Sequence, residues 1–321
     1  MIKKILNISL FMCLACAASA QSPVDVRKLG VISSEQAHNT VWENKLYRQV
    51  EFLSDSLCGG RATGTRGSTE AAFWIARRFG QLGLLPFSGQ YTKHFYGPFG
   101  RNMIGMIPGN SRGKNDSYVL VLAHYDGLGT LNGKLYPGAD SNASGVVAMV
   151  SIAEMFSAMR LLGRAYDTNV IFAAVDAKSS SMKGSRALWD MIEKERLIDP
   201  VTGNVISADR IRMVVNIDQI GGTSSRLKSG REDFIIMLGR DKVGKKYADL
   251  LSWCDSRYSI DLELGFDYFG SKEFTDVFYR RVCDQKVFVE NGVPAVLFTS
   301  GITMNNNKPH DNAASLDMAV F

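Results

Sequence analysis

The sequence has little net charge and no long apolar run after its N-terminus. Its 321 residues include 37 Lys and Arg against 32 Asp and Glu, a surplus of five. Because Lys3 and Lys4 lie in the N-terminal leader described below, the surplus of the remaining chain is only about three, too small to indicate a nucleic-acid-binding protein. No window after residue 20 contains 18 consecutive apolar residues, so we expect no membrane-spanning segment.

Cysteine is also scarce, and several catalytic motifs are missing. Five cysteines become three, Cys58, Cys254 and Cys283, once the leader is set aside. An odd number allows at most one disulfide, and no Cys-x-x-Cys pair of a zinc knuckle is present, so we expect buried, unreactive thiols. The absence of a Gly-x-Ser-x-Gly motif argues against a serine hydrolase.

The first twenty residues are typical of a secretory signal peptide. A basic start at Lys3 and Lys4 precedes a mostly apolar stretch, and Ala18-Ser19-Ala20 forms a small-x-small cleavage site. We therefore predict cleavage after Ala20 and a secreted or periplasmic protein. A lipoprotein anchored through Cys16 is the less favoured interpretation, because the three residues before it match a lipobox poorly.

The rest of the chain is patterned as an α/β protein. Short apolar runs rich in β-branched residues predict buried strands at 118–123, 169–175, 211–217, 234–238 and 294–298. Helical spacing predicts helices at 34–55, 68–82, 146–159 and 185–196, the second of them capped by Ser68. This alternation predicts a mostly parallel central sheet with helices on both faces. No linker-like segment divides residues 21–321, so we expect a single domain whose ligand site lies at the carboxyl ends of the strands.

Polar motifs stand where these strands end. They are His124-Tyr125-Asp126, then a run from Gly138 to Gly145, then Gly184-Ser185, Asn216-Ile217-Asp218, and Asn307-Lys308-Pro309-His310-Asp311. In this order, residues 45–321 resemble the co-catalytic di-zinc aminopeptidase family of peptidase clan MH. That family includes bacterial leucyl aminopeptidase, glutamate carboxypeptidase and the glutaminyl cyclases. The resemblance implies a zinc-exopeptidase fold, and it also implies a C-terminal helix that this sequence, ending at Phe321, is expected to lack.

The family holds two zinc ions with five ligands and uses a Glu as the catalytic base. By this resemblance His124 matches the first ligand, Asp126 the residue that orients it, and Asp218 the fourth ligand. The other three ligand positions hold residues that are not the family's donors, namely Ser141, Ser179 and Asn307. Lys178 stands at the position of the catalytic Glu.

These departures change the expected chemistry. Zinc sites usually have three or four protein ligands, and a lysine repels the metal and is a poor base at neutral pH. We therefore expect at most one weakly bound zinc and a catalytically degenerate homologue that binds a peptide or amino-acid ligand. Two alternatives stay open. One is an active metallo-exopeptidase that releases N-terminal amino acids at a rebuilt mononuclear zinc site, with Asp140 and His310 as substitute ligands. The other is a structural protein with a vacant cleft.

Overall fold

The computed structural model describes residues 2–17, 40–95, 99–110, 116–164, 166–222, 227 and 229–316. The longer helices are α1 (Ile2–Ala17), α3 (Thr40–Ser54), α4 (Arg66–Gln81), α5 (Gly145–Leu161), α6 (Lys183–Glu193) and α8 (Leu250–Tyr258). The shorter helices are α7 (Gly244–Ala248), α9 (Lys272–Val277) and α10 (Lys286–Glu290). Single helical turns occur at Gly59–Arg61, Ala139–Ser144, Ala208–Arg210, Arg240–Lys242, Phe278–Val282 and Ala313–Ser315.

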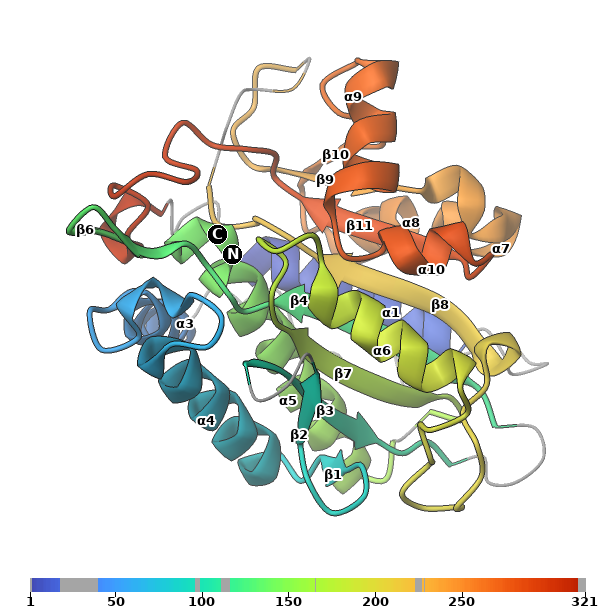
Figure 1. The fold of residues 1–321 in the computed structure, drawn as a ribbon. Coiled ribbons are helices and arrows are strands. Elements are labelled where there is room, and N and C mark those ends of the chain that lie inside the picture. Colours follow the sequence, from blue (N-terminus) through green and yellow to red (C-terminus); the bar gives the residue numbers. More distant parts are fainter. Residues whose placement is uncertain are drawn as a thin grey trace.

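A nine-stranded sheet runs through the centre of the molecule (Figure 1). Its path is β1 (Leu85–Pro86), β3 (Gly100–Ile107), β7 (Asn169–Val175), β4 (Tyr118–His124), β8 (Ile211–Ile217), β11 (Ala295–Thr299), β9 (Phe234–Leu238) and β10 (Glu263–Gly265), with β2 (Thr92–Phe95) also paired to β3. A separate hairpin joins β5 (Gly129–Leu131) to β6 (Lys134–Tyr136). The four central strands β7, β4, β8 and β11 are parallel, whereas β3 and β9 flank them as antiparallel neighbours.

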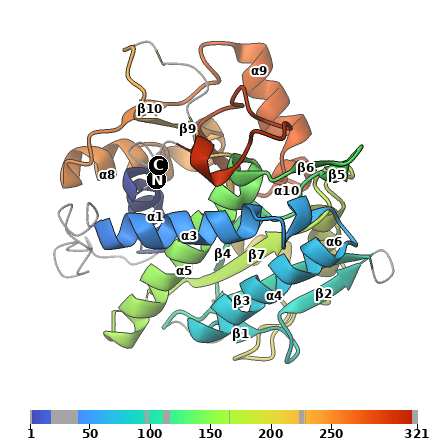
Figure 2. The ribbon, with the colours of Figure 1, turned by 90° about the vertical axis from the view of Figure 1, so that its left-hand side faces the viewer.

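Both faces of the sheet are covered by helices, which confirms the predicted fold class. Along β4, Val119, Val121 and Ala123 belong to the core shared with α3, α4 and α5. The alternate residues Leu120 and Leu122 belong to the core under α6 and α10. Figure 2 shows α3, α4 and α5 gathered on one side of the strands. Because successive side chains of a strand point to opposite faces, a continuous apolar run fills both cores.

Helix α5 illustrates how apolar this core is. Residues 139–161 form the one helical stretch in the described part of the chain that is long and apolar enough to cross a membrane, yet 67% of its most apolar window is buried inside the protein. It therefore behaves as the central core helix of an α/β sandwich. The three cysteines Cys58, Cys254 and Cys283 are buried, as predicted.

The structure corrects several local expectations. Helix α4 begins at Arg66, and its cap is Thr65, whose hydroxyl accepts a hydrogen bond from the Ser68 amide, so Ser68 lies inside the helix. The predicted helix at 34–55 is described only from Thr40, since residues 34–39 lie outside the described part. The sheet is also less parallel than predicted, because β3 and β9 run antiparallel to their central neighbours.

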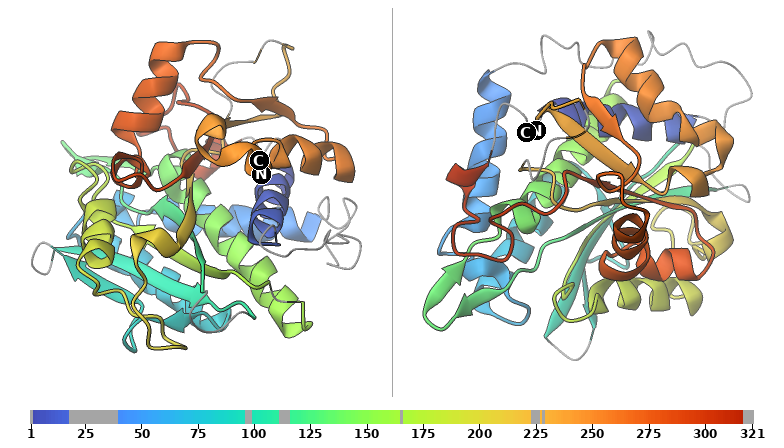
Figure 3. Two further views of the ribbon diagram at one scale, coloured as in Figure 1. Left: turned by 90° about the vertical axis from the view of Figure 1, so that its right-hand side faces the viewer. Right: turned by 90° about the horizontal axis from the view of Figure 1, so that it is seen from above.

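The N-terminal segment is a packed helix in this structure. Helix α1 lies beside α8 and over α5, on the face that carries α3 (Figure 3). Phe11 is buried and meets Phe298 of β11 edge to face, with ring centroids 5.5 Å apart. The Lys4 ammonium is fully buried and donates to the Ile220 carbonyl at 3.1 Å and the Ser300 hydroxyl at 2.7 Å. Residues 18–20, which hold the predicted cleavage site, lie outside the described residues.

Candidate functional site

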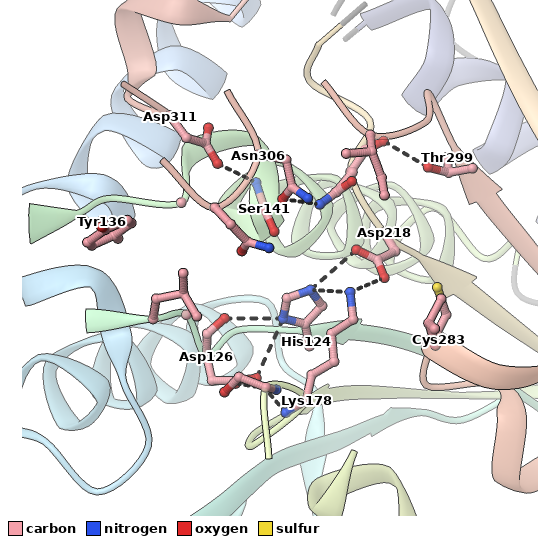
Figure 4. A pocket seen from close by; sticks show the side chains of 18 of the residues that line it. His124, Asp126, Tyr136, Ser141, Lys178, Asp218, Cys283, Thr299, Asn306 and Asp311 are labelled. Carbon is pink, nitrogen blue, oxygen red and sulfur yellow. Dashed lines mark hydrogen bonds and ion pairs between the residues drawn. The ribbon is translucent and has the colours of Figure 1, made fainter. Parts of the chain in front are cut away.

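A cavity of about 340 Å³ opens at the carboxyl ends of the parallel strands (Figure 4). His124 is the last residue of β4, Lys178 follows β7, and Asp218 follows β8. Ser141, from the turn before α5, and Asn307, from the last loop, complete the set that the structure brings around one space. The strand order of the sheet therefore places residues from five distant segments on the cavity wall.

Lys178 occupies the space between the two retained ligand positions. Its Nζ lies 2.6 Å from Asp218 Oδ2 and 3.2 Å from His124 Nε2. His124 Nε2 is in turn 3.3 Å from Asp218 Oδ1, so the three side chains close a triangle (Figure 4). Both oxygens of the Asp218 carboxylate are thus in contact with a cation or donor of the protein itself.

Asp218 is the charge that holds this triangle together, because the two cations repel each other and each is attracted to its carboxylate. Burial alone would raise the pKa of the Asp218 carboxyl, but the positive charges of Lys178 and His124 hold it well below its usual range. Burial alone would lower the pKa of Lys178, but Asp218 raises it above its usual range. For His124, burial and Lys178 oppose protonation, while Asp218 and Asp126 favour it and bring the pKa to about 9. At neutral pH the triangle holds two cations and one anion.

The Asp126 carboxylate accepts hydrogen bonds from the loop that carries Lys178. Its Oδ1 accepts the Lys178 amide at 2.9 Å, and its Oδ2 accepts the Ser179 amide at 3.1 Å and the Ser179 hydroxyl at 2.7 Å. His124 Nδ1 lies 3.1 Å from the Asp126 carbonyl oxygen, which fixes the imidazole ring. Asp126 therefore orients both His124 and the backbone at Lys178, and it uses the Ser179 hydroxyl in doing so.

The structure does not bring Asp140 and His310 into the cavity wall. The Asp140 Oδ1 atom accepts a hydrogen bond from the Gly221 amide at 2.8 Å, and burial together with Asp311 raises the pKa of this carboxyl to about 7. His310 lies exposed on the last loop and is absent from the residues that line the cavity. Asp311, its neighbour, instead accepts the Asp140 amide at 2.7 Å and the Ser141 amide at 3.1 Å.

These residues do not fit a zinc ion. Nowhere in the described ranges do three His, Cys, Asp or Glu side chains gather so that they could hold a metal. The two retained donors, His124 and Asp218, are both contacted by the Lys178 ammonium. The donor set is thus too small, and a protein cation already lies against it.

Sequence reasoning missed two parts of the site. Arg61 is fully buried, and its guanidinium donates to the carbonyls of Leu53, Tyr125, Pro137 and Gly138. It thereby ties together the loops on one side of the cavity. No local pattern could signal this role, because its four acceptors are backbone atoms from three different segments.

The second missed part is an apolar wall. Phe278, Val282, Leu297 and Ile302 line the cavity, and Phe278 stacks on Tyr268 with ring centroids 4.2 Å apart. Two of these four residues, Phe278 and Val282, come from the turn at Phe278–Val282, where two adjacent arginines separate the apolar residues. Such a short mixed segment carries no periodicity that could have indicated a binding surface.

Comparisons with known proteins agree with this architecture. The structure of BSAP, a zinc aminopeptidase from Bacillus subtilis, is similar with a TM-score of 0.63 and 13% identity, over 87% of this chain and 91% of that one. LapB from Legionella pneumophila gives a TM-score of 0.61 and 17% identity, over 88% of this chain and 71% of that one. Glutaminyl cyclase from Porphyromonas gingivalis gives 0.56 and 16%, over 87% and 92%.

A sequence search of curated proteins finds no match. At such low identity the structural likeness establishes the fold alone. The model of peptidase family M28, however, matches residues 102–321, which is well over half of the sequence and includes every site residue from His124 to Asp311. The chain therefore belongs to peptidase family M28.

Proposed function

We propose that this protein is a secreted, catalytically degenerate member of its family that binds a peptide or amino-acid ligand without hydrolysing it. The observation that carries the proposal is the position of Lys178, with its ammonium 2.6 Å from Asp218 and 3.2 Å from His124. The family's chemistry needs these two side chains as metal ligands. Here they serve as partners of a lysine.

The same geometry leaves hydrolysis without a general base. A base must hold a free lone pair near the operating pH. Lys178 does not, because Asp218 raises its pKa and keeps the amine protonated. Asp126 and Asp218 are each engaged by two or more internal donors. Activation of a water molecule therefore has no support from the side chains gathered in the cavity.

Ligand binding, in contrast, is well supported. A volume of about 340 Å³ lies in the range of small-molecule sites, which combine an apolar lining with a few fixed polar groups. The cavity has both, in the wall at Phe278 and in the triangle at Lys178. The competing proposal of a rebuilt mononuclear zinc site would need Asp140 and His310 beside His124, and neither residue is among those that line the cavity.

The test is the zinc content of the purified protein, measured together with hydrolysis of amino-acid p-nitroanilides in the same preparation. We expect less than one zinc per chain and no turnover above that of an Asp218→Ala variant. One tightly held zinc with turnover that disappears in His124→Ala and Asp218→Ala would overturn the proposal. Secretion is tested separately, by mass spectrometry of the protein recovered outside the cytoplasm, which should begin at Gln21 if the leader is cleaved after Ala20.

A further inference from the structure

The cavity exposes its cation and conceals its anions. The Lys178 side chain is 19% exposed, whereas the side chains of Asp126 and Asp218 are only 1% and 4% exposed. Asp311, the third carboxylate of the lining, is buried behind the amides of Asp140 and Ser141. A second lysine, Lys308, is exposed at the rim. A molecule entering the cavity therefore meets positive charge first.

The hydrogen-bonding groups of the wall also favour a negatively charged ligand, because they offer donors. The Lys178 ammonium carries three N–H donors and no acceptor; one is taken by Asp218 and a second lies near His124 Nε2 at 3.2 Å, which leaves at least one for a ligand. On the opposite side, the Asn306 carbonyl oxygen accepts from Gln219 Nε2 at 2.8 Å, which leaves the Asn306 amide group to donate. The three carboxylates are by contrast occupied by internal donors. Every carboxylate oxygen of the wall therefore already has an internal donor, whereas Lys178 and Asn306 have donors to offer.

From this arrangement we infer that the cavity binds its ligand through a carboxylate placed against Lys178, as in the C-terminal residue of a peptide or an N-blocked amino acid. The apolar wall of Phe278, Val282 and Ile302 then takes the adjacent side chain, so a large aliphatic residue is favoured. This inference rests on the proposed function, since it assumes a cavity whose ligand is bound and not cut. It also determines which end of the ligand faces Lys178, because a free amino terminus placed there would be repelled by the ammonium.

The experiment compares two small probes of matched shape on the full chain. N-acetyl-L-leucine has a free carboxylate and a blocked amine, whereas L-leucinamide has a free amine and a blocked carboxylate. Titration calorimetry or ligand-observed NMR should show binding of N-acetyl-L-leucine and at least tenfold weaker binding of L-leucinamide. N-acetyl-Ala-Ala-Leu, with and without a C-terminal amide, then distinguishes a peptide from a free amino acid as the source of the carboxylate.

Variants locate the binding within the cavity. Lys178→Met alone would leave the buried Asp218 carboxylate without its lysine partner and could destabilise the fold. The preferred variant is therefore Lys178→Met with Asp218→Asn, which removes both charges. It should reduce affinity for N-acetyl-L-leucine at least tenfold, whereas Lys194→Met, a lysine paired with Asp190 on an exposed helix face, should leave it unchanged.

Equal or tighter binding of L-leucinamide, or unchanged affinity in the double variant, would overturn the inference. Binding of neither probe would overturn it as well, while the absence of hydrolysis would still be judged by the metal and turnover assays. Stoichiometric zinc or turnover would instead defeat the proposed function, whichever probe is bound.

Discussion

Replacing Lys178 with methionine tests the central ion pair most directly. The change keeps a long aliphatic side chain and removes only the charge that lies 2.6 Å from Asp218. Two unit charges at this distance attract each other by about 6 kcal/mol at an effective dielectric constant of about 20. Part of that attraction offsets the cost of burying both groups, so we expect a loss of about 3 to 5 kcal/mol in the free energy of unfolding.

The assay is urea unfolding at neutral pH, followed by fluorescence, for the wild-type chain and three variants. Lys178→Met should be strongly destabilised, because it leaves the Asp218 carboxylate buried with His124 as its one remaining charged partner among the described residues. The double variant Lys178→Met with Asp218→Asn should recover much of the loss, since no charge is stranded. Lys194→Met removes an equally short but exposed pair, at 2.7 Å from Asp190, and should change nothing measurable.

The pH dependence of this loss has a definite sign. Because the pKa of Asp218 is lowered in the folded protein, the stabilisation is present above its unfolded value of about 4 and is lost as the pH falls further. Because the pKa of Lys178 is raised, the stabilisation is also lost above its unfolded value of about 10.5. A Lys178→Met variant within about 1 kcal/mol of wild type between these limits would refute the reasoning.

Three further predictions concern other parts of the site. Arg61→Met should lower the free energy of unfolding by about 3 kcal/mol or more in urea unfolding, because it strands four buried carbonyl oxygens, and Arg61→Lys should recover only part of the loss. Asp284 is fully buried, and burial raises the pKa of its carboxyl to about 6 in the folded protein, against about 4 in the unfolded chain. The free energy of unfolding should therefore be highest below pH 4, where the carboxyl is protonated in both states, and should fall as the pH rises to 6. Asp284→Asn should therefore remove a pH-dependent loss of about 3 kcal/mol between pH 4 and 6, and identical pH profiles of unfolding would contradict this. Restoring the family's donors should raise the zinc content toward two ions per chain, as measured by elemental analysis, in a variant with Ser141→Asp, Lys178→Glu, Ser179→Glu and Asn307→His. If this variant folds but binds no more zinc than wild type, the replaced ligands alone do not explain the weak metal binding, and the prediction is wrong.

The sequence predicted the central strands well for a physical reason. Residues 169–175, 211–217 and 234–238 match β7, β8 and β9 at both ends, because strands buried on both faces are mostly apolar runs bounded by polar residues. Strand β3 escaped prediction, since Gly100 and Gly105 interrupt its apolar pattern. A Cβ at Gly105 would lie only 3.0 to 3.2 Å from side-chain atoms of Leu84 and Phe79, so the glycine lets these two side chains pack closely on the strand.

Strand direction and side-chain placement lay beyond what the sequence could establish. The antiparallel pairing of β9 with β11 depends on how a long connection crosses the sheet, and no local pattern encodes it. The motif order placed His124, Lys178 and Asp218 near one another, but it could not show that the lysine reaches both partners. That outcome depends on the backbone after β7, where Ala177 adopts a φ of +57° and Asp126 accepts the next two amides.

The docking of α1 bears on the prediction that residues 1–20 are a signal peptide. If residues 1–20 are the signal peptide that their sequence predicts, the export machinery must bind this segment while it is unfolded and accessible. Once Lys4 and Phe11 are buried against Ser300 and Phe298, the segment is no longer available. On that prediction, export has to precede folding, and the cleaved chain folds without the contacts that Lys4 and Phe11 make with Ser300 and Phe298. A chain that folds first would keep its leader and remain in the compartment where it was made.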